Sequence, residues 1–118
     1  KYKIGCTGSI ISEKSDTEKV YYEIQAKKVR DFAFILSDKF KINKDTYKGV
    51  DINTYNLNEK LSVEVTKIAK DSIGIFSELF GEYPYDTYSV IASDFYIGGM
   101  EYPTLVMIDK FIDRKSVV

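Results

Sequence analysis

The chain has 118 residues, of which 44% are hydrophobic and 30% charged, which suits one soluble domain with a single core. Its 17 basic and 18 acidic side chains nearly cancel, so we expect no long-range attraction for nucleic acid or for an anionic membrane surface. The chain has no histidine and one cysteine, which excludes Ser-His and Cys-His catalysis, an internal disulfide and most zinc or copper sites built from its own residues.

The first 28 residues predict a β-hairpin. Residues 1–12 mix β-branched residues with two glycines and predict a strand that bends at Gly5 or Gly8. Residues 13–19 are polar throughout and predict the hairpin loop, and residues 20–26 alternate as the returning strand does. Within this hairpin Cys6 is interpreted as a small strand residue, because no histidine is present to activate a thiol.

The next segment predicts two strands. Residues 29–36 end in a continuous apolar run, which is typical of a strand buried on both faces, and residues 38–42 continue it as an exposed segment. Residues 43–46 predict a turn. The returning strand over 47–55 has a bulge at Gly49, and its expected inward-facing residues are Tyr47, Val50, Ile52 and Tyr55.

A long amphipathic helix is predicted over residues 57–80. Asn56 and Glu59 match the N-cap and N3 positions of a capping box, Gly81 suits the residue after the helix, and Pro84 prevents its continuation. We expect one stripe of the helix to face the core, and this stripe contains Leu61, Val65, Ile68, Ala69, Ser72, Ile73, Phe76, Leu79 and Phe80.

Two strands over residues 87–93 and 104–108 follow, and residues 109–118 predict the start of a helix. The order from residue 29 is strand, strand, helix, strand, strand. We therefore predict an α+β fold, a small mixed β-sheet with one long helix packed on it, preceded by the hairpin. Between the last two strands lies Gly98-Gly99-Met100-Glu101, where a glycine pair admits a tight turn or a close backbone approach and a single carboxylate follows.

The segment Gly98-Gly99-Met100-Glu101 resembles the Gly-x-Met-Glu-Asn exopeptidase motif of the membrane alanyl aminopeptidase family of thermolysin-like zinc metallopeptidases. Two more segments resemble this family in the same order: residues 29–34 are similar to the strand that opens the catalytic domain, and the predicted helix with the turn at 81–85 is similar to the elements before the motif. The likeness covers residues 29–110. It implies that residues 1–28 end an N-terminal β domain and that 29–118 begin the catalytic domain.

The resemblance implies that Gly98, Gly99 and Met100 line a substrate cleft at the edge of the sheet, where a peptide pairs as an added strand. Glu101 would bind the substrate's α-amine, which is mostly cationic at pH 7. The peptide substrate and the remainder of the catalytic domain are thus the expected partners, with no nucleic acid and no membrane contact from this fragment. Tyr102 stands where the family motif has Asn.

In this family zinc is bound by His-Glu-x-x-His and a later Glu, and the zinc ion polarises the carbonyl and activates water. None of these ligands is present here, so the resemblance implies a Zn²⁺ site in the parent protein beyond Val118 and an inactive isolated fragment. Two alternatives stay open: a non-catalytic peptide-binding or interaction module in which Tyr102 fills the amine pocket, and a free-standing α+β domain that binds no peptide. Composition does not indicate a compartment.

Overall fold

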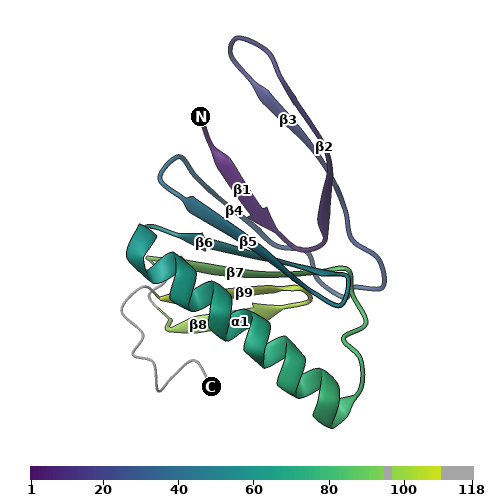
Figure 1. Ribbon diagram of the computed structural model, residues 1–118. Coiled ribbons are helices and arrows are strands. Elements are labelled where there is room, and N and C mark those ends of the chain that lie inside the picture. Colours follow the sequence, from purple (N-terminus) through teal and green to yellow (C-terminus); the bar gives the residue numbers. More distant parts are fainter. Residues whose placement is uncertain (95–96, 110–118) are drawn as a thin grey trace.

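The structure is a computed structural model that describes residues 1–94 and 97–109 (Figure 1). The described residues form nine strands and one helix. In chain order the elements are β1 (Lys3–Cys6), β2 (Ser9–Ser15), β3 (Val20–Gln25), β4 (Phe34–Ser37), β5 (Lys41–Tyr47), β6 (Val50–Asn56), α1 (Glu59–Phe80), β7 (Thr87–Ser93), β8 (Gly99–Tyr102) and β9 (Leu105–Asp109).

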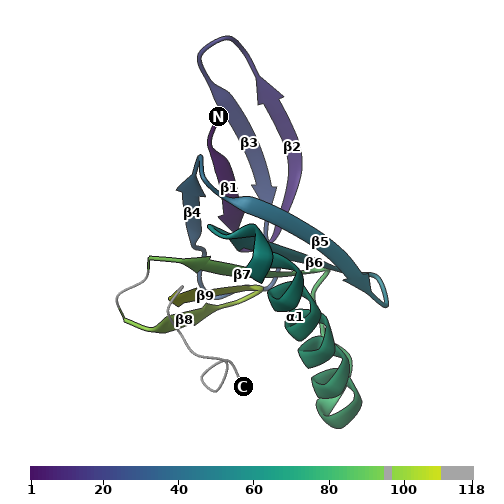
Figure 2. The ribbon, with the colours of Figure 1, turned by 60° about the vertical axis from the view of Figure 1, so that its left-hand side comes forward.

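The centre of the molecule is a five-stranded mixed sheet in the order β5-β6-β7-β9-β8. The inner strands β6, β7 and β9 run parallel, while β5 and β8 pair antiparallel at the two edges. Helix α1 connects β6 to β7 and packs on one face of the sheet, over β5 and β6 (Figure 2). This architecture confirms the predicted α+β fold, with one long helix on a small mixed sheet and a hairpin before it.

The two faces of the sheet bury separate apolar clusters. On the helix side Ile52 and Val90 pack against Ala69 of α1. On the opposite face the buried cluster contains Phe40, Tyr55, Ile91, Leu105 and Met107. The predicted inward-facing residues of β6 therefore lie on both faces of the sheet: Ile52 lies under the helix and Tyr55 lies on the opposite face. This follows from the two-residue period of a strand, because the two residues are an odd number of positions apart.

The N-terminal strands form two small sheets. Strands β2 and β3 form the predicted hairpin, which extends away from the central sheet (Figure 1), but the predicted loop over 13–19 is shorter because residues 13–15 pair within β2. Strand β1 pairs with β4, so a two-stranded sheet spans the predicted boundary between residues 28 and 29. That boundary stays a prediction.

The prediction of a doubly buried strand over residues 29–36 is wrong. The strand begins only at Phe34 and ends at Ser37, and the side chains of Phe34 and Leu36 are 55% and 47% exposed. Its single partner among the described strands is β1, and Ile35 alone turns toward the core cluster around Ile91. An apolar run identifies a strand, but it does not show how many of the strand's faces are covered.

The predicted turn at residues 43–46 is also wrong, because these residues lie inside β5. The chain reverses instead at Lys48 and Gly49, whose φ angles are 43° and 82°. Since Tyr47 pairs directly with Val50, this is a two-residue hairpin loop with positive φ at both positions, as a type I′ turn requires. Gly49 is thus a turn residue and not a bulge.

Helix α1 begins two residues later than predicted. Its N-cap is Asn58, whose side chain accepts a hydrogen bond from the backbone N–H of Lys60 at 3.0 Å, whereas Asn56 is buried at the end of β6. Only part of the predicted stripe is in the core: Ala69 and Ile73 are buried, while Phe76, Leu79 and Phe80 are exposed. The last turns of the helix extend past the strands, so they have no sheet to pack against (Figure 1).

The predicted helix over 109–118 lies outside the described residues except for Asp109, which ends β9. The part of the chain that the structure describes has no helix long and apolar enough to cross a membrane.

Candidate functional site at the edge strand

Strand β8 carries most of the glycine and glutamate motif and forms one edge of the five-stranded sheet (Figure 2). Gly98 has a φ of 82°, which favours glycine, and its carbonyl oxygen accepts a hydrogen bond from the backbone N–H of Asp109 at 2.9 Å. At Gly99 a Cβ atom would lie 3.3 Å from the carbonyl oxygen of Met107, so a larger residue would press on the neighbouring strand. These constraints explain why glycine suits both positions.

The residues of β8 alternate between the two faces of the sheet. Met100 and Tyr102 pair with Met107 and Leu105, and Tyr102 packs against the cluster that contains both partners. Glu101 pairs with Val106 and therefore lies on the opposite face, the one that carries α1. Glu101 is exposed, whereas Tyr102 is partly buried. The carboxylate and the tyrosine ring thus point away from each other.

The backbone of β8 has N–H and C=O groups on the edge that faces away from β9. In an antiparallel pair, directly opposed residues alternate between those that exchange hydrogen bonds and those whose N–H and C=O groups point outward. Because Gly98 accepts from Asp109, the residues that bond to β9 are Gly98, Met100 and Tyr102. The N–H and C=O groups of Gly99 and Glu101 consequently face away from β9, where no described strand lies.

The turn between β8 and β9 is anchored to the N-terminal strands. It consists of Pro103 and Thr104, and Thr104 has a φ of 65°, a conformation that β-branched residues rarely adopt. The backbone N–H of Gly8 donates to Thr104 Oγ1 at 2.8 Å, and the backbone N–H of Ser89 donates to the carbonyl oxygen of Thr104 at 2.8 Å. Sequence reasoning did not identify Thr104, because residues 8 and 104 are joined only by the fold.

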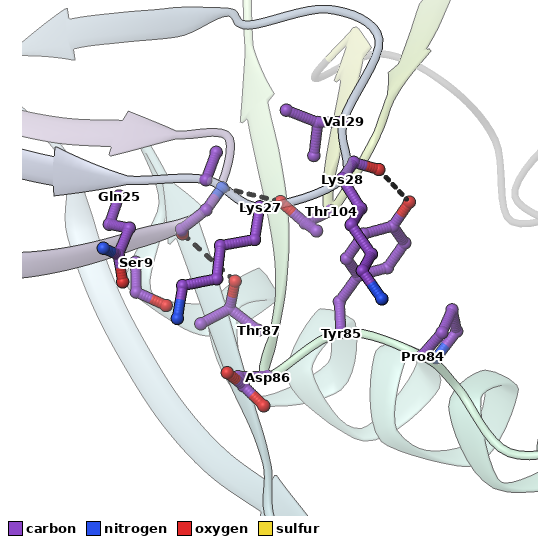
Figure 3. Close-up of a pocket in the computed structure, with 12 residues that line it drawn as sticks. Ser9, Gln25, Lys27, Lys28, Val29, Pro84, Tyr85, Asp86, Thr87 and Thr104 are labelled. Atoms are coloured by element: carbon purple, nitrogen blue, oxygen red, sulfur yellow. Dashed lines mark hydrogen bonds between the residues drawn. The ribbon is translucent and has the colours of Figure 1, made fainter.

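A cleft of about 340 Å³ lies at this anchored turn, between the N-terminal strands and the start of β7 (Figure 3). Its three charged residues, Lys27, Lys28 and Asp86, are exposed. The cleft is at the turn end of the β8–β9 hairpin, and none of the residues 98–101 lines it. Its lining residues are Gly8, Ser9, Gln25, Ala26, Lys27, Lys28, Val29, Pro84, Tyr85, Asp86, Thr87 and Thr104.

Other candidate residues have structural roles. Burial raises the pKa of Cys6 to about 11, so its thiol stays protonated near neutral pH. Tyr83 packs against the rings of Tyr85 and Tyr88 and donates its hydroxyl to the carbonyl oxygen of Thr87 at 3.0 Å. Arg30 and Asp31 form a local ion pair, with Nε and Oδ2 3.1 Å apart and both side chains largely exposed.

The described residues do not fit a zinc site. Histidine is absent from the sequence, and residues 1–94 and 97–109 contain no group of three or more Cys, Asp or Glu side chains placed to bind a metal ion. No metal-dependent step is therefore assigned to the described residues.

No protein-family model and no curated protein matches this sequence, but solved structures with the same fold exist. An M1 zinc metallopeptidase from Deinococcus radiodurans aligns with a TM-score of 0.69 and 13% identity, over 98% of this chain and 29% of that chain. A mutant of the enzyme bound to a Tyr-Ser-Ala substrate gives a TM-score of 0.69 and 12% identity, over 97% of this chain and 28% of that one.

An aminopeptidase N family protein from Idiomarina loihiensis aligns with a TM-score of 0.55 and 15% identity, over 91% of this chain and 19% of that chain. The chain thus spans less than a third of the length of these neighbours. At such low identity the likeness shows the fold alone, and the fold of this chain is that of the corresponding part of M1 zinc metallopeptidases.

Proposed function

We propose that this chain is part of a zinc-dependent aminopeptidase and that it supplies the strand which binds the peptide's backbone and free α-amine. The zinc ligands would lie outside this chain, so the 118 residues alone would bind substrate without hydrolysing it. The observation that carries the proposal is the geometry of β8: a sheet edge with no described strand beside it, on which a glycine pair is followed by an exposed carboxylate.

Backbone pairing is the first part of the proposed role. The outward N–H and C=O groups of Gly99 and Glu101 are spaced as a ladder that an extended peptide can join as a sixth strand. Gly98 and Gly99 have no side chains, which lets a second backbone approach closely at this end of β8. Such pairing involves no side chain of the substrate, so it suits a peptidase that accepts peptides of varied sequence.

Amine binding is the second part. An α-amine has a pKa near 7.7–8.0 and is mostly cationic at pH 7, so a carboxylate is its natural partner. Glu101 projects from the edge strand itself, next to the backbone groups that would hold the peptide. A substrate paired along β8 would have its register fixed by the contact between its amine and Glu101, which limits cleavage to the first peptide bond.

Tyr102 does not compete with this role. Its side chain packs with Leu105 and Met107 on the face opposite to Glu101, so it does not fill the space next to the carboxylate. This arrangement argues against the alternative in which Tyr102 occupies the amine pocket. The fold shared with a metallopeptidase that was solved with a Tyr-Ser-Ala substrate supports a peptide ligand.

The first test is the coding sequence downstream of Val118. The proposal expects a His-Glu-x-x-His motif there, and its absence would rule out a catalytic parent and favour a non-catalytic peptide-binding module.

The second test is substrate selectivity in the zinc-loaded parent enzyme. Removing one partner of a hydrogen-bonded charge pair that is buried in an interface costs about 2–5 kcal/mol, and a bound peptide in the intact enzyme would bury this pair. We therefore expect Glu101→Ala to lower kcat/KM for free-amine peptides at least about 30-fold and to change that for N-blocked peptides much less. Glu23→Ala removes an exposed carboxylate from strand β3 and is the matched control. Equal losses on both substrates in Glu101→Ala would contradict amine binding.

A further inference from the structure

The position of β8 depends on few contacts. This strand has four residues and one neighbouring strand, β9, so nothing described supports it from its outer side. Strand β9, in contrast, lies between β7 and β8 and is fixed by pairing on both sides. Besides this pairing, β8 is held by the packing of Tyr102 on the core cluster and by the turn that joins it to β9.

That turn is held in place by Thr104. Its side chain is 6% exposed and its hydroxyl accepts a hydrogen bond from the backbone N–H of Gly8 at 2.8 Å (Figure 3). The carbonyl oxygen of Gly8 in turn accepts from Thr87 Oγ1 at 3.1 Å, which ties the same corner to the start of β7. The positive φ of Thr104 is unfavourable for a β-branched residue and persists where surrounding contacts hold it.

The corner at Gly8 is closely packed. Gly8 has a φ of 80°, and a Cβ atom at this position would collide with the carbonyl oxygen of Gln25. The backbone N–H that Thr104 accepts from thus belongs to a segment that packs directly against the end of β3.

We infer that Thr104 is a positioning residue, which fixes the substrate-binding strand β8 by tying the β8–β9 turn to the Gly8 corner between β1 and β2. This inference rests on the proposed role of Glu101, which lies three residues before Thr104 on the same hairpin. Thr104 touches no substrate in this account. Through this contact the N-terminal strands help to position the carboxylate of Glu101.

Hydrogen exchange on the 118-residue chain tests the positioning without any activity. In Thr104→Ala we expect faster exchange of the two β8 amides that bond to β9, those of Met100 and Tyr102. The expected increase is about five-fold, which corresponds to the loss of one ordinary hydrogen bond. Thr104→Ser keeps the hydroxyl and should restore the wild-type rate. The amide of Ile91 in the core strand β7 reports global unfolding and should exchange more slowly than the β8 amides in every variant, which shows that β8 exchanges by local opening.

Thr87→Val is the matched control, because it removes the other hydrogen bond to Gly8 and leaves the β8–β9 turn intact. Unchanged β8 exchange in Thr104→Ala, or equal acceleration in Thr87→Val, would overturn the inference.

Selectivity in the zinc-loaded parent enzyme is the second readout. Thr104→Ala should lower the ratio of kcat/KM for free-amine over N-blocked peptides about five-fold, with Thr104→Ser close to wild type. A selective loss in Glu101→Ala without one in Thr104→Ala would overturn the positioning role and leave the proposed function intact. No selective loss in either variant would overturn the proposed function and this inference with it.

Discussion

One row of residues across the central sheet passes from the interior of the protein to solvent. On the helix side of the sheet Thr54, Val90, Val106 and Glu101 lie side by side in register on β6, β7, β9 and β8. Thr54 and Val90 are 0% and 5% exposed, Val106 is half-buried and Glu101 is exposed. The same face of the same sheet is therefore a core at one end and an open surface at the other.

The width of a helix explains this difference. A helix with its side chains is about 10 Å across, and strands lie about 4.8 Å apart, so α1 covers roughly two strands. It packs mainly on β5 and β6, while β9 reaches the cluster under the helix through Ile108 and the outer part of the face, with Val106 and Glu101, is more exposed. The covered half supplies stability, and the open half supplies the edge on which we place the peptide. We therefore expect mutations in the covered half to lower stability and mutations in the open half to affect the proposed peptide binding.

The largest expected effect is on the covered half. Ile52 is fully buried between the sheet and α1, so Ile52→Ala should lower the free energy of unfolding by about 3–4 kcal/mol. Val106→Ala shortens an aliphatic side chain on the open half of the same face and should cost about 1 kcal/mol, because its site is half-exposed. Urea unfolding of both variants measures the difference, and similar losses would show that the two halves are equally packed.

A medium effect is expected at the polar contact beneath the helix. Thr66 Oγ1 donates to the carbonyl oxygen of Ser62 at 2.7 Å, so the hydroxyl of Thr54 must donate to Thr66. Thr66→Val would leave that buried donor without a partner and should cost about 1–3 kcal/mol. The double variant Thr54→Val/Thr66→Val should recover part of the loss. Strictly additive unfolding free energies would show that the two hydroxyls are not coupled.

The smallest effect is expected at the outer edge of the covered half, where Asp45 of β5 meets the helix. The backbone N–H of Thr46 and the ammonium group of Lys70 hold the pKa of Asp45 below its usual value. A folded-state pKa below the unfolded value of about 3.9 contributes stability above that pH, and the contribution is lost as pH falls through the folded value.

Wild type should therefore lose more stability than Asp45→Asn on acidification from about pH 5. Thermal unfolding midpoints of the two proteins over this range give the comparison. A constant difference between the two midpoints would mean that the carboxylate is not stabilised by folding.

Much of the fold follows from local sequence patterns. The helix was predicted to within two residues because apolar periodicity and the stop at Gly81 are local signals. The errors concern burial and pairing. The apolar run before Ser37 marks a strand, but whether Phe34 is covered depends on which segments lie beside it. Asn56 and Asn58 are equally good caps by residue type, and the pairing of β6 with β7 decides between them.

For the candidate site the sequence indicated the residues but not their arrangement. Glycine and glutamate at 98–101 were identified by their resemblance to a motif, and the structure places Gly99, Met100 and Glu101 on an edge strand. Their binding role stays a prediction. That Glu101 and Tyr102 face opposite sides depends on strand register, and the contact between Gly8 and Thr104 joins residues 96 positions apart. Neither is encoded in a short segment.

The most direct test of amine binding by Glu101 is the pH dependence of peptide binding to the zinc-free parent protein, which would bind the peptide without hydrolysing it. Calorimetry would compare Tyr-Ser-Ala with its N-acetylated form at pH 7 and pH 9. If Glu101 binds the cationic amine, affinity for the free peptide should fall about ten-fold over this range as the amine loses its proton, while the acetylated peptide and the Glu101→Gln variant show little change. Equal affinity for the two peptides, or the same pH dependence in Glu101→Gln, would contradict the account.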